Sequence, residues 1–345
     1  MKILVLILLF PFLQYAQVQR HRTVTLMGSR FDITIVEKDS ILAEKRINEA
    51  ITEIDRIENL ISEWKPTTQI SQVNQYAGLQ PVKVDDEVIQ LTKSGLYFSK
   101  ITEGAFDISI VAMDKIWKFD GSMTVMPTEI AIKKSIEKVN YKNIVIDTVT
   151  STIFLKEKGM KIGFGSIGKG YAADRVRTLL ETKGVFGGII NASGDLTTWG
   201  KQANGKQWSI GITNPFGKEE FVDIVKLGRY AVTTSGSYEK YVEINGKKYS
   251  HIINPKTGYP SQGICSATVF GPSAEIANGF STSIMVLGLK EGTKLLANYP
   301  AYSYVLVTDK GRIIKSKNFK KNKKNFDSIS LNLWIIFMIN PKITL

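Results

Sequence analysis

The residues with the clearest chemical potential lie in one glycine-rich segment, GFGSIGKGYAAD at positions 163–174 of this 345-residue chain. A single lysine, Lys169, stands among its four glycines. Apolar runs precede the segment and a helical pattern over residues 171–182 follows it, so we expect a strand, a turn and a helix start. The free N–H groups and positive dipole end of a helix start favour an anion, and lysine adds a charge. The segment predicts a phosphate or pyrophosphate ligand, with a plain glycine-rich turn as the alternative.

The spacing within this segment approaches two phosphate-binding motifs and completes neither. Gly163-x4-Gly168-Lys169 nearly spells a nucleotide-triphosphate loop, but Gly170 stands where a Ser or Thr holds magnesium. The same glycines also spell G-x-G-x-x-G, a dinucleotide fingerprint that normally opens a first βαβ unit and here arrives in mid-chain. Other segments must therefore decide between the two interpretations.

Candidate acid–base residues are few. His21 lies near the N-terminus, and His251 precedes the turn sequence NPKTG, where a histidine is either a structural hydrogen-bonding residue or a catalyst. A serine nucleophile in the hydroxyl-rich segment 233–238 is conceivable, although no G-x-S-x-G elbow is present. Cys265 is the one cysteine, which excludes an intramolecular disulfide and disfavours zinc.

An oxygen-ligand site suits the polar residues of a predicted helix better. Asn278, Ser281 and Thr282 recur at spacings of three and four and share one helix face. Amide and hydroxyl oxygens of this kind suit magnesium, and a merely polar helix face is the alternative. Asp107, taken alone, is typical of a turn cap.

The predicted elements mix strands and helices without strict alternation. Helical periodicity marks residues 41–61, 86–102, 171–182 and 273–289. Strand patterns mark residues 23–36, 187–191, 208–212, 230–233 and 303–307, with two short strands within 141–155 and a hairpin around Asn245-Gly246. This order favours an α+β fold over a doubly wound one.

The charge balance and the two ends of the chain carry separate signals, and only the N-terminal one predicts export. The 45 basic and 32 acidic residues give a net charge of +13, concentrated in residues 315–324. That run predicts a solvated tail or attraction to a membrane surface, and no nucleic-acid motif accompanies it. Lys2 and the apolar residues 3–13 predict that residues 1–17 form a signal peptide or an N-terminal anchor. We expect a periplasmic protein, either free or anchored to the inner membrane. Residues 319–345 are expected to form a tail that is basic at first and then apolar.

Seven segments, taken together and in order, resemble the ApbE family of FAD:protein FMN transferases. They are MGS at 27–29, TEGAFD at 102–107, GSIGKGYAAD at 165–174, NASGD at 191–195, TSGSY at 234–238, HIINPKTGYP at 251–260 and ANGFST at 277–282. The resemblance covers roughly residues 22–318. It implies a single large α+β domain of the ApbE-like, T-fold-like kind.

The resemblance also implies an activity, which is magnesium-dependent transfer of FMN from FAD to a threonine of an acceptor protein, with release of AMP. The acceptor would carry its threonine in a motif of the type D-x-x-[ST]-[GA]-A-T. Two alternatives remain open: an FAD-binding protein with weak or no transferase activity, and an FAD pyrophosphatase that forms FMN and AMP.

Site residues follow from the same resemblance. FAD contacts are expected from Met27, Trp64, Ala105, Phe106, Asp107, Gly163, Lys169, His251 and Ile252. Magnesium ligands are expected from the backbone carbonyl of Ser166 and from Asn278, Ser281 and Thr282. His251 and Lys169 are the expected catalytic residues.

Two positions depart from the family pattern. The family usually has aspartate where this chain has Asn278, and an amide oxygen brings no charge, so magnesium affinity should fall. It usually has an acid at the position of Gly163, so one contact to the nucleotide is lost or supplied from elsewhere. Asn254 replaces an aspartate before Pro255, which is a milder change.

Overall fold

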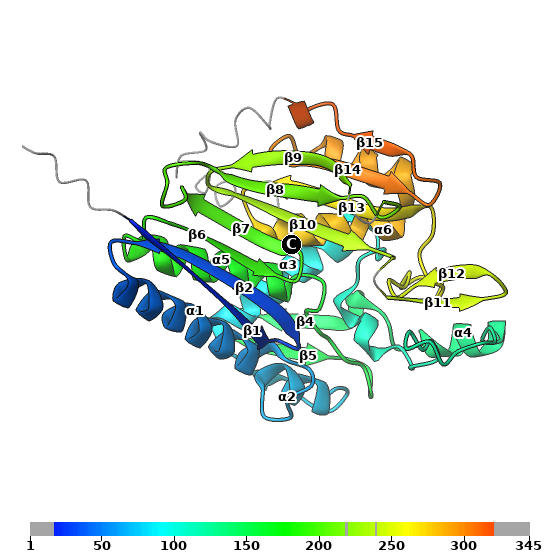
Figure 1. The fold of residues 1–345 in the computed structure, drawn as a ribbon. Coiled ribbons are helices and arrows are strands. Elements are labelled where there is room, and N and C mark those ends of the chain that lie inside the picture. Colours follow the sequence, from blue (N-terminus) through cyan, green and yellow to red (C-terminus); the bar gives the residue numbers. More distant parts are fainter. Residues whose placement is uncertain (1–16, 218–219, 239, 321–345) are drawn as a thin grey trace, which may run out of the picture.

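The structure is a computed structural model that describes residues 17–217, 220–238 and 240–320. At its centre lies an eight-stranded sheet in which all neighbouring strands are antiparallel, in the order β1-β2-β6-β7-β10-β13-β14-β15 (Figure 1). Its strands are β1 Val18–Leu26, β2 Ser29–Glu37, β6 Gly187–Ala192, β7 Asp195–Gly200, β10 Tyr230–Gly236, β13 Ile264–Gly271, β14 Ser303–Thr308 and β15 Ile313–Lys315.

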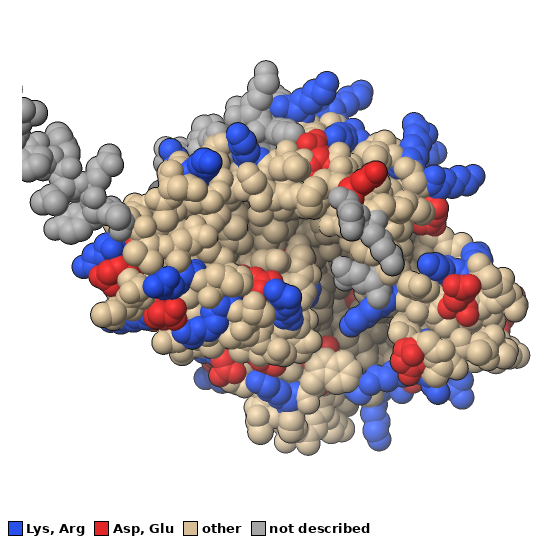
Figure 2. Space-filling model, in the orientation of Figure 1, with Lys and Arg blue, Asp and Glu red and all other residues tan. Residues whose placement is uncertain are grey.

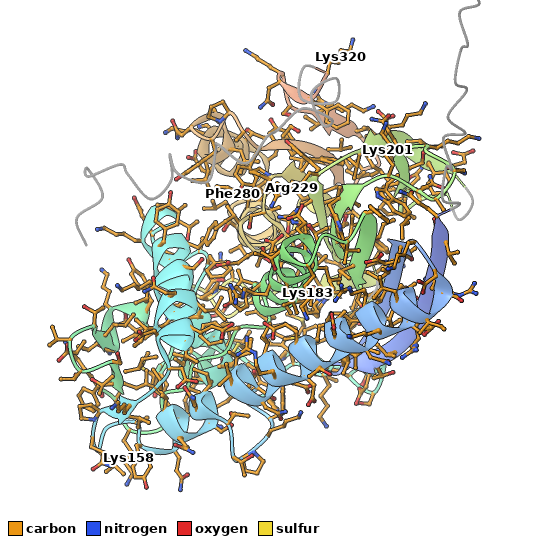
Figure 3. The ribbon with its side chains drawn as sticks, turned by 90° about the vertical axis from the view of Figure 1, so that its left-hand side faces the viewer. Lys158, Lys183, Lys201, Arg229, Phe280 and Lys320 are labelled. Atoms are coloured by element: carbon orange, nitrogen blue, oxygen red, sulfur yellow. The ribbon has the colours of Figure 1, made fainter. Side chains whose placement is uncertain are left out.

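Three helices pack side by side on one face of this sheet. They are α1 Ser40–Ile61, α5 Gly168–Thr182 and α6 Ala274–Ala297. Helix α1 covers β1 and β2, α5 covers β6 and β7, and α6 covers β10 and β13, as the views from two sides show (Figures 1 and 3). Helix α1 forms because Asp39 caps its first turn and because a stripe that includes Ile47, Ile54 and Ile61 is buried.

Smaller elements close both sides of this layer. Helix α3 Asp86–Ile101 packs against α6, and α2 Gln69–Gln75 packs against α1 and against a three-stranded sheet of β3 Val82–Lys83, β5 Thr152–Leu155 and β4 Ile144–Asp147. The hairpin of β8 Trp208–Thr213 and β9 Phe221–Leu227 covers the other face of the main sheet. Alternation along β13 shows the two faces, because Phe270 packs with the hairpin and Val269 joins the cluster around α6.

The remaining elements frame the loops of the site. They are η1 Ile108–Ala112, α4 Glu129–Ser135, η2 Tyr141–Asn143, β11 Tyr241–Ile244 and β12 Lys247–Ser250. Strands β11 and β12 pair as a hairpin around Asn245 and Gly246, both with positive φ, as the sequence predicts.

The α+β expectation is confirmed, and two element boundaries are corrected. Residues 23–36 belong to two strands and not to one, because Met27 and Gly28 form a tight turn with φ of 51° and 64°. Helix α6 continues beyond residue 289 to Ala297 across a kink at Gly288, whose φ of 76° is non-helical.

The predicted terminal segments fall largely outside the described residues. This applies to the proposed leader up to residue 16 and to the tail from residue 321. Within the described part, Phe319 is buried against Phe270, so the folded body reaches past residue 318. Among the helices described, none has the length and apolar character needed to cross a membrane.

Candidate active site

A cavity of about 620 Å³ opens where the start of α5, the first turns of α6, the ends of β7 and β10 and the loop after β12 meet. The face shown in Figure 2 is hollowed near its middle, with Lys and Arg side chains beside the hollow. Eleven of the predicted site residues line the cavity: Trp64, Ala105, Phe106, Asp107, Gly163, Ser166, Lys169, His251, Ile252, Asn278 and Thr282. The structure therefore brings together positions more than 200 residues apart in the chain.

The glycine-rich segment forms the expected turn and helix start. The N–H groups of Ile167 and Gly168 donate to the carbonyl of Phe164, and α5 begins at Gly168. No side chain caps this N-terminus. Lys169 lies in the first turn and lines the cavity. A helix start of this kind provides N–H groups and a positive dipole end for an anion.

Two residues of the same segment serve packing. A Cβ atom on Gly170 would lie 2.6 Å from the carbonyl oxygen of Ala274, so only glycine allows α5 to approach the start of α6 this closely. The Asp174 carboxylate accepts hydrogen bonds from Ser273 Oγ at 2.7 Å and from the Glu275 N–H at 3.1 Å. These contacts hold the N-termini of both helices against each other at the cavity.

Helix α6 presents neutral oxygen donors to the cavity. Asn278 and Thr282 line it together with Ser166 of the turn. The Asn278 side chain is only 5% exposed, and its Oδ1 has no hydrogen-bond partner among the described residues. A buried carbonyl oxygen without a partner is costly, and a hard cation that prefers oxygen ligands satisfies it. The donor set fits Mg²⁺.

Ser281, the remaining predicted ligand, is not among the residues that line the cavity. It is fully buried, donates to the Asn278 carbonyl at 3.0 Å and forms a hydrogen bond with Ser235 Oγ at 2.8 Å. The Ser281 side chain in this arrangement supports the oxygen-bearing face from behind. Its predicted role as a ligand therefore lacks support from the geometry.

An aspartate without a predicted role connects the two halves of the site. Asp195 begins β7, and its side chain is 3% exposed. Its Oδ2 lies 2.9 Å from Lys169 Nζ, and its Oδ1 accepts a hydrogen bond from Asn278 Nδ2 at 3.0 Å. The signal was available in NASGD, where an acid follows a strand and a tight turn, but no spacing rule links it to residues 169 and 278.

His251 has a defined tautomer in its neutral form. Its Nδ1 lies 3.0 Å from the carbonyl oxygen of Lys240. A carbonyl oxygen can only accept, so Nδ1 carries the hydrogen and the lone pair of the neutral ring is on Nε2. The side chain is exposed and lines the cavity. A histidine held in this way can accept a proton at Nε2.

The aromatic and apolar positions expected to contact FAD line the cavity, except Met27, which lines an adjoining one. Trp64 is 73% exposed, with Lys115 Nζ 4.6 Å from its ring centroid. Met27 lies in an adjoining cavity of about 510 Å³ that also includes Trp64 and Lys169. Phe106 packs into the core against Phe98, with ring centroids 5.4 Å apart. The exposed Trp64 ring and the tight turn at Met27 offer a surface for a flat ligand.

Asp107 caps a turn and lines the cavity as well. Its carboxylate accepts hydrogen bonds from the N–H groups of Ser109 at 2.8 Å and Tyr141 at 2.9 Å. Burial raises the pKa of Asp107 above its ordinary value, and these hydrogen bonds oppose the rise. The turn-cap interpretation and the FAD-contact interpretation are therefore compatible.

A glutamate occupies the space that a side chain at position 163 would fill. A Cβ atom on Gly163 would lie 3.1 Å from Glu63 Cδ and 3.3 Å from its Oε1. Glu63 borders the two smaller cavities that adjoin the site. Burial raises the pKa of its carboxyl group. An acid is thus present beside residue 163, supplied from the segment that follows α1.

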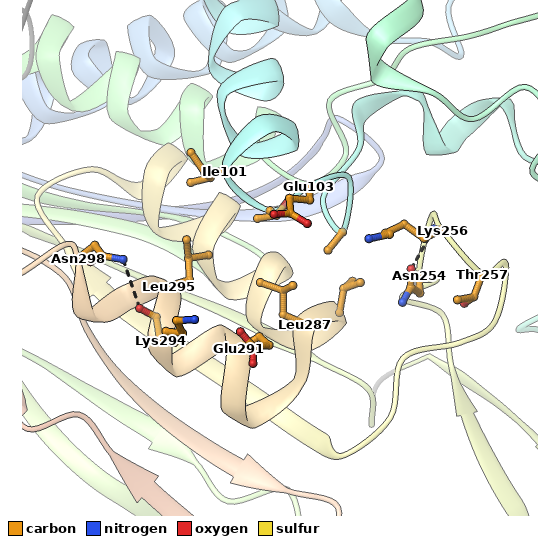
Figure 4. A pocket seen from close by; sticks show the side chains of 13 residues that line it. Ile101, Glu103, Asn254, Lys256, Thr257, Leu287, Glu291, Lys294, Leu295 and Asn298 are labelled. Atoms are coloured by element: carbon orange, nitrogen blue, oxygen red, sulfur yellow. Dashed lines mark hydrogen bonds between the residues drawn. The ribbon is translucent and has the colours of Figure 1, made fainter. Parts of the chain in front are cut away.

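A second groove of about 610 Å³ adjoins the site along α6 (Figure 4). It shares Ala105 and Val286 with the first cavity. In the close view, Leu287 of α6 faces the segment that carries Glu103. The groove spans the kink at Gly288, because Val286 and Leu287 precede the kink and Glu291 follows it.

Comparisons with known proteins agree with this geometry. The ApbE family model matches residues 27–306. An FAD:protein FMN transferase of Klebsiella pneumoniae is 29% identical over 296 residues, which cover 85% of this chain and 90% of that protein. One of Salmonella typhimurium is 30% identical over 287 residues, with 81% of each chain covered.

Solved structures show the same fold. The ApbE protein of Thermotoga maritima has a TM-score of 0.80 at 28% identity, over 89% of this chain and 99% of that one. The flavin transferase ApbE of Vibrio cholerae has a TM-score of 0.78 at 24% identity, over 88% and 99%. The family match includes every residue of the cavity from Trp64 to Val286. The chain belongs to the ApbE family.

Proposed function

We propose that this protein transfers FMN from FAD to a threonine hydroxyl of an acceptor protein, with Mg²⁺ as cofactor and AMP as the other product. Flavin transfer from FAD rests on family membership and on relatives named FAD:protein FMN transferase. One observation supports the proposed Mg²⁺-dependent cleavage of the FAD diphosphate. An uncapped helix start, Lys169 and the buried Asn278 Oδ1 meet in one cavity.

The diphosphate of FAD would bind at the start of α5. The N–H groups of that turn and the Lys169 ammonium complement its charge. The Ser166 carbonyl, Asn278 and Thr282 would hold Mg²⁺, which supplies charge neutralisation at the phosphates when bound. These protein donors are neutral, so the ligand phosphates contribute most of the negative charge, and Mg²⁺ should bind far better with FAD present than without it.

The transfer replaces the phosphoanhydride bond of FAD with a phosphoester bond to threonine. The threonine oxygen attacks the FMN phosphorus, the bond from that phosphorus to the bridging oxygen breaks, and AMP leaves with the bridging oxygen. The hydroxyl proton goes to Nε2 of His251, which the Lys240 carbonyl keeps in the required tautomer. Lys169 stabilises charge on the phosphates as the bond breaks.

Glu63 is the acid that replaces the missing side chain at position 163. Its carboxyl group fills that space and adjoins the cavities that contain Trp64 and Met27. It would accept a hydrogen bond from a hydroxyl or amino group of FAD. Glu63→Ala should weaken FAD binding in a fluorescence titration, and an unchanged dissociation constant would remove Glu63 from the site.

The place of action is proposed to be outside the cytoplasm, on the basis of residues 1–17. Residues 1–25 fused to a reporter that is active only after export provide the test. An inactive but well-expressed reporter contradicts the proposal.

The activity is tested by incubating the purified protein with FAD, Mg²⁺ and a threonine-containing acceptor peptide, and then weighing the peptide. Transfer adds the mass of FMN less one water. An unmodified peptide together with free FMN and AMP indicates the pyrophosphatase alternative. Intact FAD and an unmodified peptide indicate a protein that binds FAD without turnover.

A further inference from the structure

Asp195 is a buried carboxylate that contacts two residues of the proposed reaction site at once. Its Oδ2 is 2.9 Å from Lys169 Nζ on α5, and its Oδ1 accepts from Asn278 Nδ2 on α6 at 3.0 Å. It stands at the first position of β7 and lines the same cavity. It therefore connects the phosphate side and the cation side of the site through one side chain.

The hydrogen bond from Asn278 to Asp195 decides which end of the amide faces the cavity. A carboxylate can accept but not donate, so it selects Nδ2 and leaves Oδ1 at the opposite end of the planar group. That Oδ1 is the buried oxygen without a hydrogen-bond partner among the described residues. A rotated amide would point Nδ2, which repels a cation, into the site.

The same hydrogen bond places a negative charge directly behind the neutral ligand. A hydrogen bond to an ionised carboxylate polarises the amide and makes Oδ1 a better cation ligand, as outer partners do in metal sites generally. In the structure, the Lys169 ammonium balances the Asp195 charge. If Lys169 moves to the phosphates of FAD, the Asp195 charge becomes available to balance a cation held at Asn278.

We propose that Asp195 is a positioning residue, which orients Asn278 toward the cation, supplies the charge that this amide lacks, and releases Lys169 when a diphosphate binds. This inference rests on the proposed Mg²⁺-dependent function. It predicts that diphosphate binding and Mg²⁺ binding strengthen each other partly through Asp195.

The test is calorimetric titration of Mg²⁺ into the full protein, alone and with ADP. ADP carries the adenosine diphosphate half of FAD and has no flavin to transfer. Asp195→Asn should weaken Mg²⁺ binding roughly 10- to 100-fold and reduce the factor by which ADP strengthens it. Asp223→Asn makes the same charge change in an ion pair with Lys315, outside the cavity, and should leave both quantities unchanged.

An exchange variant separates charge and orientation from simple packing. Asp195→Asn combined with Asn278→Asp keeps a carboxylate and an amide in contact and moves the charge onto the ligand. It should bind Mg²⁺ at least as tightly as the original protein, and therefore rescue Asp195→Asn. Thermal unfolding shows which variants are folded. If Asp195→Asn alone does not fold, the exchange variant is compared directly with the original protein.

Two results overturn the inference and are distinguishable from failure of the proposed function. If the original protein binds Mg²⁺ and Asp195→Asn binds it with the same affinity, the role of Asp195 is limited to a structural ion pair. An exchange variant that binds no better than Asp195→Asn shows that the charge is irrelevant. Absence of Mg²⁺ binding to the original protein, with and without ADP, contradicts the proposed cofactor itself and the inference with it.

Discussion

Lys169 pairs with a carboxylate in the structure, and the proposed reaction would give it a second kind of anionic partner. In the structure its ammonium is paired with Asp195, and its side chain is 25% exposed. The proposed reaction requires the same ammonium at the FAD phosphates. Lys169 would therefore have an anionic partner with or without FAD. Asp195, which loses the ammonium when FAD binds, would need another cation.

Replacement of Lys169 by alanine should affect both binding and stability. FAD binding should weaken by about 1.5–3 kcal/mol, the value of a charge-assisted hydrogen bond. The free energy of unfolding should fall by about 1–3 kcal/mol, because a buried carboxylate loses its cation, and adding Asp195→Asn should recover part of that loss. FAD titration and denaturant unfolding measure the two effects. Lys183→Ala, at the far end of α5, is the control, and an FAD affinity equal to that of the control would contradict the role.

His251→Gln should lower the rate of transfer roughly 10²- to 10⁴-fold, because the variant has no side chain that accepts the hydroxyl proton. The free energy of unfolding should change by less than about 0.5 kcal/mol, since this side chain is exposed. His21→Gln, in β1 and outside the cavity, is the matched control. A transfer rate equal to that of the control would show that another group accepts the proton.

The sequence was sufficient for residues that lie within motifs and insufficient for residues that meet across the fold. The shared face of Asn278 and Thr282 followed from helical spacing alone. The contacts of Asp195 and Glu63 depend on how β7 and α1 approach α5 and α6, and sequence separation carries no information about that approach. The turn at Met27 was missed because alternation continues on both sides of it.

At the level of elements, the site depends on the junction between α5 and α6. Gly170 allows the helices to touch, and Asp174 caps the start of α6 through Ser273 and Glu275. This junction sets the position of Lys169 relative to Asn278. Helix periodicity predicted that both helices exist, but not that their N-termini meet.

Gly170→Ala should destabilise the protein by about 1–3 kcal/mol, in spite of the higher helix propensity of alanine, which favours the variant by about 1 kcal/mol. The new Cβ would lie 2.6 Å from a backbone carbonyl, which cannot yield as a side chain can. Gly165→Ala is the control in the same segment, because nothing lies within 4 Å of its Cβ position, and it should change stability by less than about 0.5 kcal/mol. Denaturant unfolding decides, and equal effects of the two substitutions would contradict the account of the junction.

The junction also makes stability depend on pH through Glu275. Burial, and secondarily the Asp174 carboxylate, raise the pKa of Glu275 from 4.5 to about 7. As pH rises from 4.5 to about 7, the unfolded chain loses this proton while the folded protein keeps it, so stability falls, and the full cost applies above that range. Glu275→Gln should gain stability relative to the original protein between about pH 5 and pH 8, by up to about 3 kcal/mol. Denaturant unfolding of both proteins at about pH 5 and pH 8 tests this, with Glu243→Gln as the exposed control. A difference in the free energy of unfolding between Glu275→Gln and the original protein that is the same at both pH values would contradict it.

In the whole molecule, one antiparallel sheet, one layer of helices and the loops between them bring most of the site residues to one cavity and Met27 to an adjoining one. In the sheet order β6-β7-β10-β13, strand β7 carries Asp195 and lies beneath α5. Its neighbour β10 lies beneath α6. The α+β class followed from the mixture of predicted elements, whereas the strand order did not, because pairing between distant strands leaves no local pattern. The placement of residues from six of the seven resemblance segments in one cavity, with the seventh in the adjoining cavity, supports flavin transfer as an activity of the whole fold.

Transfer of FMN yields two products, and the most direct measurement counts both of them in one reaction. The protein is mixed with FAD, Mg²⁺ and an acceptor peptide, and AMP and flavinylated peptide are quantified at several times. We expect one AMP for each flavinylated peptide, with FMN attached at the threonine oxygen. Neither product should form when Mg²⁺ is chelated. AMP formed together with free FMN while the peptide stays unmodified would contradict it.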